Sequence, residues 1–106
     1  MNVYPLFFPQ NNDVIVTATF PEITDGTGMT ATFWYKDDKY TADTASDTTS
    51  YQSSVIQNAT GGWFSTFNIP GTDNDTPGTY WWRIDVVDAQ NKRRTANAGP
   101  ALVEAV

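Results

Sequence analysis

The sequence contains neither cysteine nor histidine among its 106 residues. Without cysteine there are no disulfide bonds and no thiol nucleophiles. Together the two absences exclude Cys/His zinc sites, serine–histidine–aspartate triads and imidazole acid–base chemistry. Apolar runs such as Leu6–Phe8 and Val14–Val16 are also far shorter than the ~20 residues that span a bilayer. We therefore predict a protein that is not an enzyme, uses no cofactor and does not insert into membranes.

Basic residues are scarce as well. Six Lys and Arg stand against twelve Asp and Glu, which gives a net charge of −6. A chain this acidic lacks the positive surface that binds nucleic acid or anionic lipid, so we predict neither as a partner. The first residues, Met1–Leu6, show no basic region followed by a long apolar stretch. We therefore expect no signal peptide and folding in a cytoplasm.

Aromatic residues are abundant, with four Trp, five Tyr and six Phe. Residues 1–106 are enough for one domain that buries its own core. Apolar side chains alternate with polar ones along several runs, and no window keeps a helical period without Pro or Gly. This pattern predicts strands over 3–9, 14–20, 29–36, 51–57, 63–69 and 79–87, and a last one from about Lys92.

The strand spacing favours an all-β fold, an immunoglobulin-like β-sandwich of about seven to eight antiparallel strands, with essentially no helix. A small closed barrel is the alternative. Between these runs, the polar stretch 41–50 is predicted to be either a mobile loop or an edge strand.

Residues 77–91, PGTYWWRIDVVDAQN, resemble the E–F corner, F strand and F–G turn of immunoglobulin-like modules. The resemblance implies that Tyr80 packs in the core and returns a hydrogen bond from its hydroxyl to the corner backbone. It also implies that Trp34 corresponds to the tryptophan of strand C. Trp82 stands where the second cysteine of antibody domains would be, and its ring could fill the space between the sheets.

A second resemblance concerns the chain as a whole. A solitary, acidic, cysteine-free domain that starts at Met1 and closes with Arg93–Glu104 is similar to small immunoglobulin-like structural proteins of tailed bacteriophages. This implies a virion protein, in capsid decoration or associated with the tail, whose partners are other virion subunits. A carbohydrate-binding or adhesin-type module that contacts a host-surface glycan, resting on Trp81 and Tyr40, is the alternative.

Two groups of residues are candidates for binding a partner. Trp81 and Arg83 share the strand face opposite Tyr80, and Trp and Arg are common at binding hot spots. Lys92, Arg93 and Arg94 carry half of the positive charge and could dock on an acidic partner. The structural alternatives are that neighbouring strands cover Trp81 with Arg83 stacked on its ring, and that the basic run protects a strand edge.

A weaker candidate is a calcium site at Asp73, Asn74 and Asp75, since hard cations prefer closely spaced oxygen ligands. In the structural alternative, which we favour, these residues form turns before the strand at 79–87.

Overall fold

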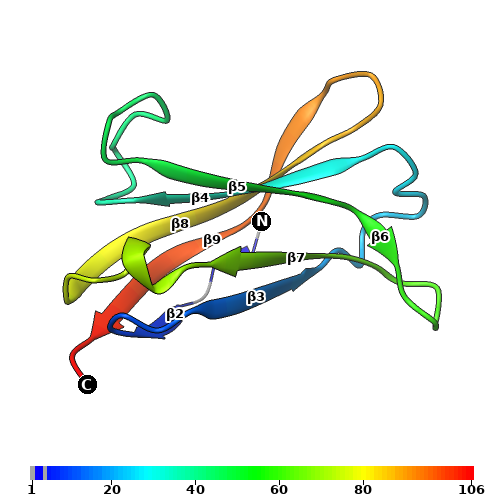
Figure 1. Cartoon of the computed structure of the whole chain (residues 1–106). Helices are drawn as coiled ribbons and strands as arrows, with labels where there is room; N and C mark the ends of the chain where they lie inside the picture. Colours follow the sequence, from blue (N-terminus) through cyan, green and yellow to red (C-terminus); the bar gives the residue numbers. More distant parts are fainter. Residues whose placement is uncertain (1, 4) are drawn as a thin grey trace.

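Strands dominate the computed structural model, which describes residues 2–3 and 5–106 (Figure 1). Met1 and Tyr4, the latter within the predicted strand 3–9, lie outside the described residues. The 3₁₀ turn Gly71–Asp73 is the only helical segment in these two ranges. The strands are β1 (Asn2–Val3), β2 (Leu6–Pro9), β3 (Val14–Thr19), β4 (Thr30–Lys36), β5 (Thr49–Ser54), β6 (Ile56–Gln57), β7 (Trp63–Ile69), β8 (Gly78–Val87) and β9 (Arg93–Glu104). The all-β prediction is confirmed.

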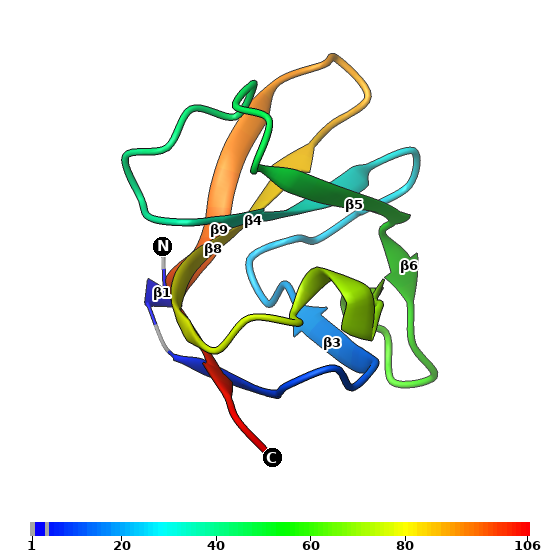
Figure 2. The same cartoon turned by 60° about the vertical axis from the view of Figure 1, so that its left-hand side comes forward.

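The strands form two sheets that pack against each other (Figures 1 and 2). The larger sheet has the order β1-β9-β8-β4-β5, with β2 also paired to β9, and the smaller one has the order β3-β7-β6. Alternation places one face of each sheet in a shared core and leaves the other face for solvent. The arrangement is consistent with a β-sandwich.

The prediction of antiparallel strands throughout is wrong for the start of the chain. Both β1 and β2 run parallel to β9, with Leu6 opposite Ala101 and Pro9 opposite Glu104. Parallel neighbours need a long connection, and here the six strands from β3 to β8 provide it. The two segments occupy the edge that β9 would otherwise leave unpaired.

The predicted strand 51–57 is divided between the two sheets at Val55. On one side of this residue Ser54 lies opposite Thr30 of β4, and on the other Ile56 lies opposite Phe64 of β7. Val55 is buried, and its amide donates to the carbonyl of Met29 at 3.1 Å. The crossing ties the sheets together along one side, and β6 pairs antiparallel with β7, the next strand along the chain.

Aromatic rings join the two sheets at the centre of the core. Phe33 of β4 stacks on Trp82 of β8, with ring centroids 5.8 Å apart and planes within 2° of parallel. Phe67 of β7, in the opposite sheet, lies 5.7 Å from Phe33. All three side chains are almost fully buried, and the Trp82 indole donates to the carbonyl of Pro100 at 3.1 Å. The prediction that Trp82 fills the space between the sheets is confirmed.

The prediction for Trp34 is wrong. Alternation along β4 turns Phe33 and Tyr35 into the core, so Trp34 between them faces the other way. Its ring lies under the Arg83 guanidinium, whose carbon is 5.4 Å from the ring centroid. Trp34 therefore belongs to the surface of the larger sheet rather than to the core.

The predicted corner at Tyr80 is confirmed. The Tyr80 hydroxyl donates to the carbonyl of Thr76 at 2.6 Å, which closes the loop that leads into β8. The half-buried Tyr80 ring meets Tyr35 edge-on, with centroids 5.5 Å apart. This contact fixes the start of β8 against the core.

We predict that Trp82→Ala lowers the free energy of unfolding by about 3–5 kcal/mol, because it removes a buried ring and leaves a cavity. Urea denaturation followed by circular dichroism measures the loss. The control is Ile15→Ala, whose side chain is 68% exposed on β3 and should change stability by less than about 0.5 kcal/mol. Equal effects of the two changes would contradict a core centred on Trp82.

We also predict that Tyr80→Phe costs about 1 kcal/mol, since it removes the bond to Thr76 and keeps the ring. Thermal unfolding should show a fall of several degrees. An unchanged melting temperature would mean that the corner hydrogen bond does not stabilise the fold.

Candidate functional site

The five residues predicted to bind a partner lie in two adjoining places. Trp81 and Arg83 are half-buried on the outer face, by which we mean the side of the larger sheet that faces away from the smaller one. Arg93 and Arg94 begin β9 at one end of the sandwich, and Lys92 comes just before them in the turn that follows β8. Arg93 connects the two places, because its guanidinium lies 3.7 Å from Asp85 and 3.9 Å from Asp43 on the outer face.

A buried carboxylate holds Arg83 in place. Arg83 and Asp85 are two residues apart on β8, so both side chains project from the same face. The Nε and Nη2 atoms of Arg83 each donate to one oxygen of Asp85 at 2.9 Å. Thr95 of β9 adds a hydrogen bond to Asp85 at 2.8 Å, and Asp85 is only 1% exposed. A buried charge needs such partners, and Asp85 has them.

Asp43 joins this pair from the long loop between β4 and β5. One of its oxygens accepts from Arg83 Nη2 at 2.9 Å, and the other accepts from the ammonium of Lys36. Lys36 itself is 4% exposed and also donates to the carbonyl of Thr41 at 2.8 Å. The hydrogen bond from Arg83, followed by that from Lys36, outweighs burial and lowers the pKa of Asp43 to about 2.

These contacts fasten the loop 37–48 to the outer face (Figure 2). The sequence predicted either a mobile loop or an edge strand over 41–50. The structure has both there, since the loop continues to Thr48 and β5 begins at Thr49. At the far side of the loop Tyr40 is 84% exposed, with the Lys39 ammonium 5.2 Å from its ring centroid.

Sequence reasoning missed Lys36, Asp43 and Asp85. A signal existed for Asp85, because Arg and Asp two residues apart on a strand place opposite charges side by side. Lys36 and Asp43 carried no comparable signal. Of the alternatives for Trp81, the half-buried ring agrees with partial cover, but Arg83 stacks on Trp34 instead of on Trp81.

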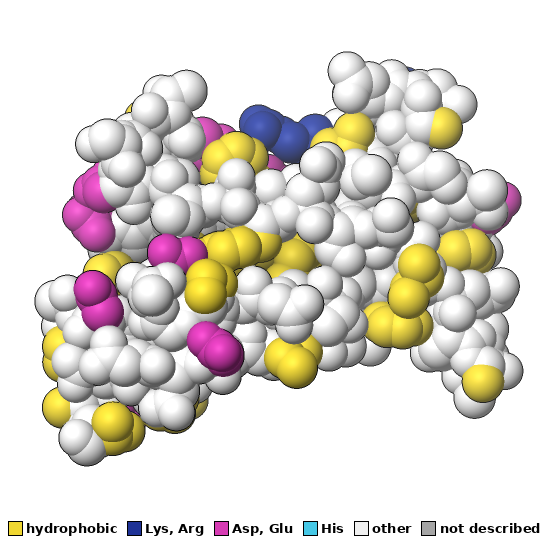
Figure 3. Space-filling model, in the orientation of Figure 1, with side chains coloured by type: hydrophobic (Ala, Val, Ile, Leu, Met, Phe, Trp, Pro, Cys, Tyr) yellow, Lys and Arg dark blue, Asp and Glu magenta, His cyan; other side chains and the backbone are white. Residues whose placement is uncertain are grey.

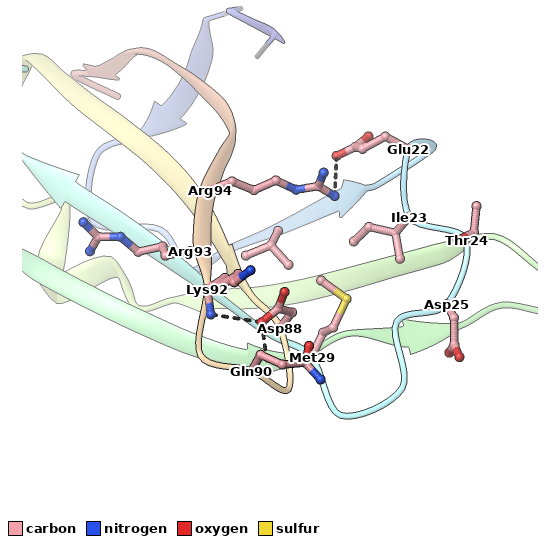
Figure 4. A pocket seen from close by; sticks show the side chains of 11 residues that line it. Glu22, Ile23, Thr24, Asp25, Met29, Asp88, Gln90, Lys92, Arg93 and Arg94 are labelled. Carbon is pink, nitrogen blue, oxygen red and sulfur yellow. Dashed lines mark hydrogen bonds and ion pairs between the residues drawn. The ribbon is translucent and has the colours of Figure 1, made fainter.

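The basic run lines a pocket of about 380 Å³ at the end of the sandwich (Figure 4). The floor is apolar, with Ile23, Met29 and Val86, and the rim is charged. Arg94 reaches toward Glu22, 3.8 Å away, whereas Arg93 points out of the pocket toward Asp43 and Asp85. The rim residues are Glu22, Asp25, Asp88, Lys92, Arg93 and Arg94.

The turn that carries Lys92 is well defined. The Asp88 carboxylate accepts from the amides of Gln90 and Lys92, at 3.0 and 2.9 Å, and Asn91 adopts a left-handed conformation with φ of 64°. Such a turn suits Asn, whose short side chain tolerates positive φ. Within the described parts of the chain the Lys92 ammonium has no ion-pair partner. It is thus the basic group of the run that is open to a partner.

Asp73, Asn74 and Asp75 lie at the opposite end, in the turn before β8. Asn74 is buried, and its side chain donates to the carbonyl of Asn12 at 3.1 Å. Asp73 accepts from the hydroxyl of Tyr51, and the Asp75 carbonyl accepts from Gln10 at 2.8 Å. Residues 2–3 and 5–106 contain no group of three carboxylates close enough together to enclose a metal ion. Calcium binding by these three residues stays a prediction.

No helix in the described segments is long and apolar enough to cross a membrane. No known protein family matches the chain, and no curated protein is similar to it at a significant level.

We predict that Asp43→Asn destabilises the protein by about 2 kcal/mol near pH 6, and that the difference disappears as the pH falls from about 4 to 2. The sign follows from the lowered pKa of Asp43: its ionised form stabilises the fold above the unfolded pKa near 3.9, and that contribution is lost on protonation. Urea denaturation at several pH values measures it.

The control for Asp43 is Glu104→Gln, which removes an exposed carboxylate that has no ion pair in the described residues. Its effect should be below about 0.5 kcal/mol and independent of pH. A pH-independent effect of Asp43→Asn would contradict the ionic attachment of the loop.

Proposed function

We propose that this chain is an immunoglobulin-like binding module that serves as a structural protein in the virion of a tailed bacteriophage. In this proposal it folds in the cytoplasm of the bacterial host and docks on another virion subunit, in capsid decoration or on the tail. No catalytic step is part of the role. The resemblance of residues 77–91 and of the chain as a whole motivates this assignment.

The strand order supports the immunoglobulin-like part of the proposal. The first strands pair parallel to the last, β9, β8 and β4 lie side by side, and β3, β7 and β6 form the second sheet. The crossing at Val55 and the corner at Tyr80 agree with it. Such a sandwich is compatible with many roles, so the binding role needs its own support from the surface.

The distribution of positive charge carries the binding role. All six basic residues of this acidic chain lie along the outer face, on the loop beside it or at the adjoining pocket: Lys36, Lys39, Arg83, Lys92, Arg93 and Arg94. Figure 3 shows Lys and Arg side chains together at the top of the molecule, between the two protruding loops, whereas Asp and Glu are prominent at the left-hand end. Cations gathered on one side of an acidic chain orient an acidic partner and suppress wrong orientations.

The half-buried rings of Trp34 and Trp81 add apolar area to the same face. Arg83 is held rigidly over Trp34 by Asp43 and Asp85, so little side-chain entropy is lost when a partner packs there. The surface thus combines aromatic area with fixed and mobile cations. On a repetitive virion surface a weak contact of this kind is multiplied by avidity.

Mass spectrometry of gradient-purified particles of the phage that carries the gene tests the role. We expect the chain at a fixed copy number per particle, and purified chain to rebind particles from which it has been stripped. Absence from particles together with no rebinding would overturn the proposal. A saturable response on a glycan array would instead favour the carbohydrate-binding alternative, which Tyr40 supports through its exposed ring.

We predict that Lys92→Gln together with Arg94→Gln weakens rebinding by about tenfold, because each change removes a cation that faces the acidic partner. The loss should shrink as salt rises. The matched control is Thr17→Glu with Thr66→Glu on the outer side of the smaller sheet, which changes the net charge by the same amount. Equal losses would assign the effect to total charge rather than to this surface.

A further inference from the structure

A pocket of about 160 Å³ lies at the end of the sandwich where β4 finishes and β8 begins. Four aspartates from two separate loops surround it. Asp37 and Asp47 stand at the two ends of the loop 37–48, and Asp73 and Asp75 precede β8. Lys36 also lines the pocket, but its ammonium is turned to Asp43 and Thr41. The pocket is therefore strongly negative, at the end of the molecule where Figure 3 shows carboxylates gathered.

The buried hydroxyl of Tyr35 is the second notable feature of this pocket. Tyr35 is 4% exposed and lines the pocket beside Tyr80, and its hydroxyl has no hydrogen-bond partner in the described chain. Burial, followed by the nearby phenols and Asp73, raises the pKa of Tyr35, so the hydroxyl stays neutral. A buried hydroxyl without a partner costs free energy. Its oxygen is free to coordinate a ligand that enters the pocket.

The aspartates are arranged as one close pair and two flanking groups. Asp37 and Asp47 line the pocket from the two ends of the loop 37–48, and Asp73 and Asp75 line it from the turn before β8. Like charges that share one small pocket repel each other, and a cation between them relieves that repulsion. Asp73 accepts from Tyr51 and Asp75 accepts from Thr76 through one oxygen each, so each keeps a further carboxylate oxygen for the pocket.

We propose that this pocket binds a hard divalent cation, calcium in preference to magnesium, held by Asp37, Asp47 and the Tyr35 hydroxyl. Asp73 and Asp75 contribute charge from the facing loop. The donor set consists of oxygens alone, which suits calcium, and its loop positions suit the flexible geometry that calcium accepts. Because no three carboxylates of the described residues enclose an ion, water completes the coordination shell.

This site differs from the one that the sequence suggested. Asn74 is not among the residues that line this pocket, and its side-chain nitrogen donates to the carbonyl of Asn12. The ion instead connects the two ends of the loop 37–48 to each other and brings them toward the turn before β8. The site is independent of the proposed virion role, and either can fail without the other.

Calcium titration followed by thermal unfolding tests the site. We expect a dissociation constant of about 10⁻⁴ to 10⁻³ M, and a melting temperature about 5 °C higher at calcium tenfold above that constant than in chelator. Terbium, which replaces calcium, should luminesce on tyrosine excitation because Tyr35 and Tyr80 line the pocket. No calcium shift and no terbium signal would overturn the proposal.

Two variants locate the ion. Asp37→Asn and Asp47→Asn should each abolish the calcium shift and the terbium signal, even though either change can stabilise the calcium-free protein by relieving repulsion. The matched control is Asp38→Asn, next to Asp37 in the same loop, whose side-chain oxygen can still accept from the amides of Tyr40 and Thr41. A calcium response that survives in both pocket variants overturns the site. An equal rise in melting temperature with methylammonium chloride in place of calcium overturns it as well.

Discussion

The stack of Phe33 on Trp82, with Phe67 against it from the other sheet, is the contact on which the rest of the structure depends. With no cysteine in the chain, no disulfide bond joins the sheets, so burial of these rings provides the central connection. The hydrogen bond from Trp82 to Pro100 satisfies the one polar atom of its ring and links β8 to β9. Stability is thereby concentrated inside, and the two ends and the outer face are left for other roles.

Strand β8 shows how one segment supports both the core and the surface. Trp82 and Ile84 point into the core, whereas Arg83 and Asp85 project from the outer face. Asp85 is buried there and bonded to Arg83. The core fixes the backbone, the backbone fixes the Arg83–Asp85 pair, and that pair holds Asp43 and its loop in place. The same loop supplies Asp37 and Asp47 to the acidic pocket. The surface proposed to bind a subunit and the pocket proposed to bind calcium are thus connected through one loop.

Alternation in the sequence predicted most strands, and the resemblance of residues 77–91 to an immunoglobulin-like corner and strand implied the role of Trp82 and the bond made by Tyr80, because both patterns act over a few residues. The position of Trp34 was wrong because it came from a family resemblance, whereas the alternation of β4 placed Phe33 inside. The parallel pairing of β1 and β2 and the crossing at Val55 depend on contacts distant in sequence. For the same reason, nothing local indicated that Asp43 would meet Arg83, forty residues away.

Native-state hydrogen exchange of backbone amides in β7 and β8 tests the central claim most directly. If the aromatic stack unites the sheets, amides of both strands exchange only through global unfolding, with the free energy that urea denaturation gives. Amides of the loop 37–48 exchange through smaller openings in the same experiment. Exchange of β7 at a free energy about 2 kcal/mol or more below that of β8 would show that the smaller sheet separates by itself, and would contradict the account.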